Sequence, residues 1–132
     1  MSWSQWHSII AASNPAPSSQ RGVYRVRATD GEGNALAIRR AADTDAEGIL
    51  YIGQGDLIAR IGGLLDTADA GPGSHNFIQN FVHYGFDKIV PRAHLEVQWK
   101  VCANPEHEEM DLLEEYITRF CGLPPGNFTS GG

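Results

Sequence analysis

The sequence predicts an α+β domain in which a three-stranded antiparallel sheet is flanked by helices, with an additional helix at the N-terminus. Two kinds of pattern predict this class. Apolar and polar residues alternate in residues 22–28 and 95–102, as they do in half-buried strands. Apolar residues recur every three or four positions in residues 57–65 and 105–121, as they do on the buried face of a helix. Strand and helix patterns therefore follow one another along the chain.

The 132 residues suggest a single domain with one core. We divide the chain into an N-terminal helix and linker at residues 1–20, the α+β domain at residues 21–128, and a short tail at residues 129–132. Residues 3–12 fit an amphipathic helix that packs on the domain as a lid. Its apolar face carries Trp3, Trp6, Ile9 and Ile10.

The sheet is predicted from three segments that follow one another. Residues 22–28 form the first strand and residues 35–40 return as the second. Residues 49–52 are continuously apolar, which suits a third strand that is covered on both faces. Turns rich in glycine or aspartate separate the segments, and residues of these types adopt turn conformations at little cost. The three segments predict an antiparallel meander, and residues 95–102 then form a half-buried edge strand.

Three helices are predicted after the meander. A glycine turn leads to the first, which Asp56 caps. The second covers residues 75–86. The third begins at Asn104 and Pro105, because asparagine caps helices and proline is tolerated at the first position, and it ends before Gly122. The buried stripe of the first helix consists of Leu57, Ile58, Ile61, Leu64 and Leu65. The stripe of the third consists of Met110, Leu113, Ile117 and Phe120, with Leu112 and Tyr116 beside it.

The formal net charge is −6. This acidity argues against a wide electrostatic groove for nucleic acid, because proteins with such grooves are usually basic. Five of the ten basic residues nevertheless lie within twenty positions of one another: Arg21, Arg25, Arg27, Arg39 and Arg40. A local site for a phosphate group is therefore compatible with an acidic chain.

The chain shows no pattern of a membrane span or a signal peptide. Its apolar runs are short, and the N-terminus lacks a basic region followed by a long apolar one. Cys102 and Cys121 do not have the spacing of zinc ligands, and we expect both to be reduced. These observations predict a cytoplasmic protein that does not bind membranes.

The acidic residues of the third helix are not equivalent. At about 100° per residue, Glu109 lies only about 40° from the middle of the apolar stripe, whereas Glu108 and Glu115 lie on the solvent side. Interaction with the helix dipole accounts for acids in the first turn, such as Glu106 and Glu108. A carboxylate on an apolar face is unfavourable unless a cation pairs with it. Glu109 therefore indicates a neighbouring arginine, a metal ion, or exposure at a frayed first turn.

An ordered set of residues resembles the GIY-YIG nuclease domain. The set consists of Gly22-Val-Tyr24, Tyr51-Ile-Gly53, Arg60 in the next helix, Glu109 in a late helix, and Asn127. Each tripeptide alone is weakly specific, but the ordered set on the expected elements is more specific. The resemblance spans residues 21–128. It implies a three-stranded antiparallel sheet flanked by helices, in an enzyme that cuts phosphodiester bonds in DNA with one divalent metal ion, Mg²⁺ or Mn²⁺.

The resemblance also implies a role for each matched residue. Glu109 would ligate the metal ion. Tyr24 would act as the general base for the attacking water or would orient that water, and Tyr51 would contact the water or the scissile phosphate. Arg60 would bind the phosphate, since a guanidinium pairs with two phosphate oxygens. Asn127 would support the site from the end of the chain. The ordinary pKa of tyrosine is about 10, so we expect cations, namely Arg60 and the metal, to lower the pKa of Tyr24.

Some assignments have alternatives. Glu114 is a second candidate for the metal ligand, because it is closer to Asn127 in the sequence. Further candidates for substrate binding are Arg25, Gln54 and His75. A turn residue and a solvated histidine are the ordinary roles of the last two.

A second function is also open. The chain could be a non-catalytic module that binds nucleic acid or protein and retains the GIY-YIG fold. Its acidity fits a protein that needs a partner for targeting, and the sequence does not separate DNA from RNA as the substrate. The complete set of matched residues favours an active enzyme.

Overall fold

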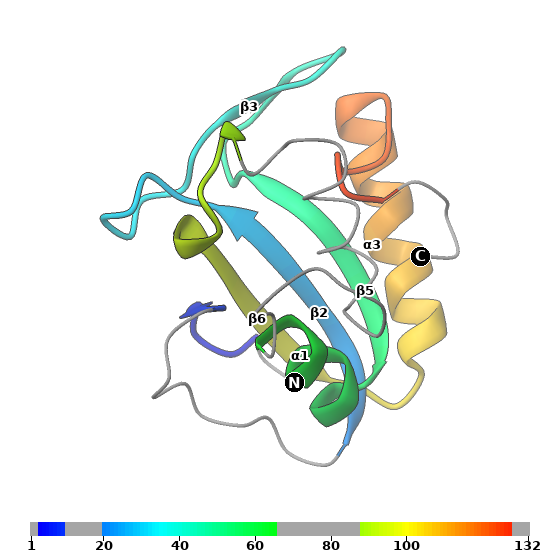
Figure 1. Cartoon of the computed structure of the whole chain (residues 1–132). Coiled ribbons are helices and arrows are strands. Elements are labelled where there is room, and N and C mark those ends of the chain that lie inside the picture. Colours follow the sequence, from blue (N-terminus) through cyan, green and yellow to red (C-terminus); the bar gives the residue numbers. More distant parts are fainter. Residues whose placement is uncertain (1–2, 10–19, 66–87, 128–132) are drawn as a thin grey trace.

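A four-stranded antiparallel sheet forms the centre of the molecule in a computed structural model that describes residues 3–9, 20–65 and 88–127. Its strand order is β1-β6-β2-β5 (Figure 1). The strands are β1 (His7–Ser8), β6 (Leu95–Val101), β2 (Arg21–Ala28) and β5 (Ile49–Asp56). The α+β class is therefore confirmed, whereas the predicted number of three strands is wrong.

Strand β2 lies between β5 and β6 and is covered on both faces. Val23, Tyr24 and Val26 are each 0 % exposed, although Val23 points to one face of the sheet and Tyr24 and Val26 point to the other. The predicted meander is wrong, because the second predicted segment does not enter this sheet. Its strand β3 (Ile38–Arg39) pairs instead with the short strand β4 (Thr44–Asp45). The alternation of apolar residues predicts a strand, which forms only at Ile38–Arg39, but it does not specify the pairing partner.

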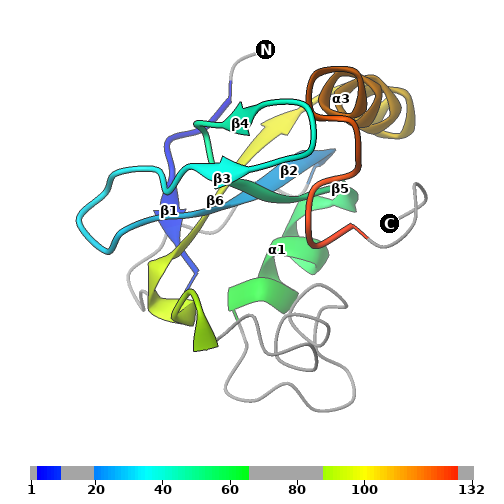
Figure 2. The ribbon, with the colours of Figure 1, turned by 90° about the horizontal axis from the view of Figure 1, so that it is seen from above.

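Helix α1 (Leu57–Leu65) and helix α3 (Pro105–Phe120) cover opposite faces of the sheet (Figure 2). The core on the α1 side contains Ile9, Tyr24, Val26, Tyr51, Leu57, Ile61, Leu95 and Val97. The core on the α3 side contains Ile49, Ile52, Leu113, Tyr116 and Phe120. The two layers of side chains hold the sheet between the helices.

The start of α1 agrees with the predicted cap. The Asp56 carboxylate accepts hydrogen bonds from the main-chain N–H groups of Ile58, at 3.0 Å, and Ala59, at 3.4 Å. Leu57 and Ile61 are buried as expected, but Ile58 is 45 % exposed and its assignment to the buried stripe is wrong. The remaining side chains of the predicted stripe, and the helix predicted over residues 75–86, lie outside the described residues.

The last helix begins as predicted and buries a different stripe. Asn104 accepts a hydrogen bond from the main-chain N–H of His107 at 3.3 Å, and Pro105 takes the first position. The residue that ends the helix in the left-handed conformation is Cys121, with φ of 62°, rather than the residue after it. The buried residues are Pro105, Glu109, Leu113, Tyr116 and Phe120. Met110 and Ile117 are 60 % and 40 % exposed, so the predicted stripe is rotated around the helix.

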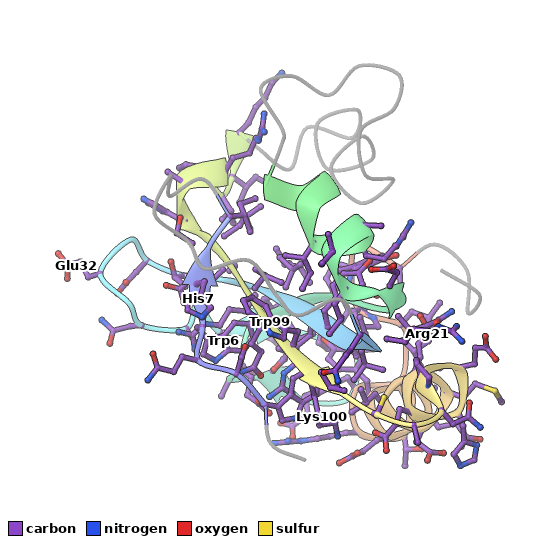
Figure 3. The ribbon with its side chains drawn as sticks, turned by 90° about the horizontal axis from the view of Figure 1, so that it is seen from below. Trp6, His7, Arg21, Glu32, Trp99 and Lys100 are labelled. Atoms are coloured by element: carbon purple, nitrogen blue, oxygen red, sulfur yellow. The ribbon has the colours of Figure 1, made fainter. Side chains whose placement is uncertain are left out.

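The helix predicted at the N-terminus is wrong for its described part, because residues 3–9 are extended beside β6. Ser4 donates its main-chain N–H to the Trp99 carbonyl at 2.7 Å, and Ile9 donates to the Leu95 carbonyl at 3.2 Å. The ring of His7 stacks on Trp99 with 5.1 Å between centroids. Figure 3 shows His7 and Trp99 on this side of the sheet. Strand β6 is consequently not an edge strand. Its main-chain groups accept the hydrogen bonds of the N-terminal segment, and the spacing of apolar residues in that segment does not reveal this pairing.

The tryptophans of this segment lie on cationic side chains of the sheet. The Arg25 guanidinium lies 4.3 Å from the ring centroid of Trp3, and that of Arg27 lies 4.4 Å from the ring centroid of Trp6. Such contacts are favourable because the face of an aromatic ring is electronegative. They place the rings of Trp3 and Trp6 on the face of the sheet to which Arg25 and Arg27 point, which is the α3 side.

No helix among the described residues has the length and apolar character needed to cross a bilayer.

The buried position of Ile9 yields a prediction about stability. We expect Ile9→Ala to lower the free energy of unfolding by about 3 kcal/mol, because it removes a fully buried branched side chain from the core. Urea denaturation of both proteins measures this change. The matched control is Gln5→Ala in the same extended segment, where the side chain is exposed. Equal stability of the two variants would contradict the placement of the N-terminal segment in the sheet.

Candidate functional site

Tyr24 and Tyr51 point to the same face of the sheet from neighbouring strands. In the register of β2 and β5, Tyr24 pairs with Gly53 and Tyr51 pairs with Val26. Cross-strand partners share a face, so both phenol rings lie on the α1 side. The ring centroids are 6.0 Å apart and the planes are inclined by 38°. The structure therefore brings together the tyrosines of the two matched tripeptides.

The position of the Tyr24 ring requires glycine at position 53. A Cβ atom added to Gly53 would lie 2.5 Å from the hydroxyl oxygen of Tyr24. Unbonded carbon atoms normally keep about 3.5–4.0 Å from their neighbours. Gly22 plays a similar part in the main chain, because a Cβ there would collide with the Lys100 carbonyl of β6. One glycine makes room for the tyrosine, and the other lets the two strands approach.

Arg60 reaches both phenols from α1. Strand β5 runs directly into this helix, so the glycine turn predicted between them is wrong. Gly55 is still paired with β2 and has φ of +135°, and a Cβ there would lie 3.3 Å from Cγ of Arg60. Its guanidinium lies close enough to both phenols for its positive charge to lower the pKa of Tyr24 and that of Tyr51. Arg60 is half-buried, whereas the tyrosines are 0 % and 3 % exposed.

Burial controls the protonation of the two phenols. It raises the pKa of Tyr24 well above the ordinary value, and the neighbouring Tyr51 adds to this rise. The positive charge of Arg60 acts in the opposite direction but is a smaller effect. The pKa of Tyr51 is also raised, chiefly by burial. Arg60 alone therefore does not lower the pKa of Tyr24 as expected, and both hydroxyls keep their protons at neutral pH.

Glu109 faces inward from α3 and is 7 % exposed. Helix α3 packs against β5, the edge strand of the sheet, and from there the Glu109 charge raises the pKa of Tyr51. Burial raises the pKa of Glu109 itself, while the charge of Arg60 lowers it. Among the described residues, its carboxylate forms neither a salt bridge nor a hydrogen bond. Glu114, the alternative candidate, is exposed on the same helix.

Asn127 closes the outer edge of β5. Its Oδ1 accepts a hydrogen bond from the Ile52 N–H at 3.0 Å, and its Nδ2 donates to the Ile52 carbonyl at 2.9 Å. The preceding Gly126 N–H donates to the carbonyl of Leu50 at 2.6 Å. The side-chain amide thus pairs with β5 as another strand would. It holds the main chain between Tyr51 and Gly53.

Two further candidates lie on the α3 side of the sheet. The Arg25 guanidinium donates to the side chain of Gln98 and lies 3.8 Å from the Glu47 carboxylate. Gln54 alternates with the glycines on either side of it, so its side chain points away from the tyrosines. Its buried Oε1 has no hydrogen-bond partner among the described residues. His75 lies outside the described part of the chain.

The donor set around Glu109 fits a hard divalent cation. Mg²⁺ and Mn²⁺ favour carboxylate oxygens and often retain water molecules as further ligands. Glu109 offers a carboxylate with no other partner in the described residues, and burial penalises its negative charge. A cation would remove that penalty. No cluster of three or more acidic, histidine or cysteine ligands occurs within the described ranges, so water and substrate oxygens would complete the coordination of a cation at Glu109.

Sequence reasoning did not single out Trp99. Strand β6 places it directly opposite Tyr24, on the same face of the sheet. The alternation of Val97, Trp99 and Val101 identifies the shared face of β6, but it does not reveal that β6 neighbours β2. That neighbour relation depends on contacts between distant parts of the chain.

A scan against protein-family models and searches of curated proteins and of solved structures gave no match.

The raised pKa of Glu109 predicts how stability depends on pH. A carboxyl whose pKa is raised by folding favours the folded state when protonated, and this advantage is lost as the pH rises through the raised pKa. We therefore expect Glu109→Gln to be more stable than the wild type at neutral pH. The difference should vanish below about pH 4, the ordinary range of glutamate, where both side chains are neutral.

Thermal unfolding at several pH values, in buffers without divalent cations, measures this difference. Glu114→Gln is the matched control on the same helix, and it should show no comparable gain because its side chain is exposed. A Glu109→Gln variant that is less stable than the wild type at neutral pH would show that the folded chain already neutralises the carboxylate.

Proposed function

We propose that the chain is an endonuclease of the GIY-YIG type, which hydrolyses phosphodiester bonds in DNA with Mg²⁺ or Mn²⁺. The observation that carries this proposal is the convergence of Tyr24, Tyr51 and Arg60, with the inward-facing Glu109 close enough for its charge to act on Tyr51. Among the described residues the Glu109 carboxylate has no hydrogen-bond or salt-bridge partner. These four side chains come from four different elements, β2, β5, α1 and α3, in distant parts of the sequence. A purely structural cluster would not need a buried carboxylate whose pKa stays raised despite the charge of Arg60.

Arg60 is the residue that binds the phosphate in this proposal. Its guanidinium is planar and carries several donors, so it can pair with two phosphate oxygens at once. Nε of Arg60 is buried and has no hydrogen-bond partner in the described part of the chain. Arg60 is also more exposed than either tyrosine, and a phosphate approaching the site meets it first.

The tyrosines act as hydrogen-bond donors. With their protons retained, the hydroxyls of Tyr24 and Tyr51 donate to the attacking water or to a phosphate oxygen and so orient the reacting groups.

Glu109 would hold the divalent cation. When bound, this cation supplies Lewis-acid polarisation of the phosphate and a lowered pKa for a bound water. Asn127 positions the strand that carries Tyr51.

The burial of both tyrosines favours a second candidate function. A non-catalytic module that binds nucleic acid or protein would keep Tyr24 and Tyr51 as core residues, and they are 0 % and 3 % exposed. In either case we propose a cytoplasmic protein with a protein partner that supplies targeting. The free state of Cys102 and Cys121 favours a reducing compartment.

Cleavage of plasmid DNA with Mg²⁺ or Mn²⁺ tests the function. Glu109→Ala and Arg60→Ala should each slow cleavage by about 100-fold or more, because each removes charge stabilisation at the reacting phosphate. Glu114→Ala is the matched control and should cleave like the wild type, since Glu114 is exposed on the solvent side of the same helix.

A chelating agent should abolish cleavage by the wild type. Parallel reactions with single-stranded RNA decide whether DNA is the preferred substrate. Nucleic-acid binding without cleavage of any substrate would favour the module. Cleavage that survives both Glu109→Ala and Arg60→Ala would contradict the assigned site.

A further inference from the structure

An apolar groove lies at the end of the sheet where β2 ends and β5 begins. It has a volume of about 310 Å³, at the lower end of the usual range for ligand pockets, which begins at about 300 Å³. Its lining comes from Ala28, Leu50, Pro125, residues 36–39 and residues 89–90. Figure 1 shows that these segments gather away from α1, the helix that carries Arg60. The groove is therefore separate from the proposed nuclease site.

The groove exposes large apolar side chains. Ile89 is 77 % exposed and Leu36 is 38 % exposed. Clustered apolar surface of this kind marks interaction sites, whereas single exposed residues are ordinary. Both residues line the same groove. Its surface is consequently complementary to an apolar ligand.

Main-chain groups form part of the groove wall. Leu36, Ala37, Ile38 and Arg39 all line it. Alternate side chains of an extended segment point in opposite directions, so four consecutive lining residues must contribute their backbone as well. Strand β3 has a paired strand on one side only within the described residues. The main chain of Ala37 makes no hydrogen bond in the same part of the molecule.

The charged side chain in the described lining of the groove is basic. Arg39 is the only charged residue among the described lining residues, and it is exposed. Lys88, also exposed, directly precedes the lining residue Ile89. This local positive charge contrasts with the net charge of −6 for the whole chain. An acidic group on the ligand would be attracted to it.

We propose that this groove binds an extended apolar peptide segment of a partner protein, which adds to β3 as a further strand and places an acidic side chain against Arg39. Unpaired strand edges are ready templates for such addition, in which main-chain hydrogen bonds supply affinity and side-chain pockets supply specificity. The peptide's apolar side chains lie against Leu36 and Ile89. Binding does not require cleavage activity, so this proposal stands independently of the nuclease.

The probe is a library of random linear peptides displayed on phage and selected against the full chain. Enriched peptides, synthesised with a fluorophore, are measured by fluorescence anisotropy. We expect them to alternate apolar and polar residues and to carry an acidic residue. Ile89→Asp and Arg39→Glu should each weaken binding by at least about tenfold, because each removes a central contact.

Ile117→Asp is the matched control. Ile117 is 40 % exposed on α3 and does not line the groove, so the same substitution there should leave affinity unchanged. Glu109→Ala should also bind peptide like the wild type, which separates this proposal from the nuclease. Circular dichroism confirms that each variant is folded. Methylating the main-chain nitrogens on one edge of the peptide should abolish binding.

Three results would overturn the proposal. The first is that no enriched peptide depends on Ile89 or Arg39. The second is that main-chain methylation has no effect, which would exclude strand addition. The third is that sedimentation shows a dimer of the wild type that Ile89→Asp dissociates, which would assign the groove to a second copy of the chain.

Discussion

The Tyr24 ring lies over the bare main chain of Gly53, and the arrangement of the site depends on this contact. In the observed register of β2 against β5 it requires glycine at position 53, because a side chain there would displace the phenol. A slip of one residue in that register would turn Tyr51 to the opposite face of the sheet. In the same register Gly55 lies opposite Gly22, and the absence of a side chain at Gly55 leaves room for Arg60. A single missing Cβ therefore links sheet pairing to the geometry of the polar groups.

Burial outweighs the charge of Arg60 in setting the protonation of Tyr24, Tyr51 and Glu109. Burial raises the pKa of Tyr24, Tyr51 and Glu109, and Arg60 is the cation that opposes the effect for all three of them. Within the described part of the chain no salt bridge pairs with Glu109, and a buried carboxylate without a paired charge is unfavourable. A divalent cation would pair with it, whereas a second anion would not. The burial that makes a carboxylate unfavourable at position 109 is therefore the same feature that would favour a bound metal ion there.

Local patterns in the sequence predicted the parts of the fold that depend on neighbouring residues. The cap at Asp56 and the inward direction of Glu109 follow from helix geometry and were confirmed. The segment around Ile9 has a helical pattern, yet it pairs with β6 because strand edges from distant parts of the sequence supply its hydrogen bonds. The predicted meander is wrong because β2 pairs with β5 and β6, which lie further along the chain than the segment that follows β2 directly. The site residues were found by resemblance, but the burial that raises the pKa of Tyr24 depends on tertiary packing and could not be predicted from spacing.

Diffraction from crystals soaked in Mn²⁺ tests the central claim most directly, since anomalous scattering locates this ion without assumptions about catalysis. The account predicts an anomalous peak at the Glu109 carboxylate, on the side that faces Tyr51 and Arg60, in wild-type crystals. The peak should be absent from Glu109→Gln crystals soaked in the same way. Wild-type crystals in which Mn²⁺ binds elsewhere, with Glu109 unligated at neutral pH, would contradict the assignment of this cluster as a metal-dependent phosphodiesterase site.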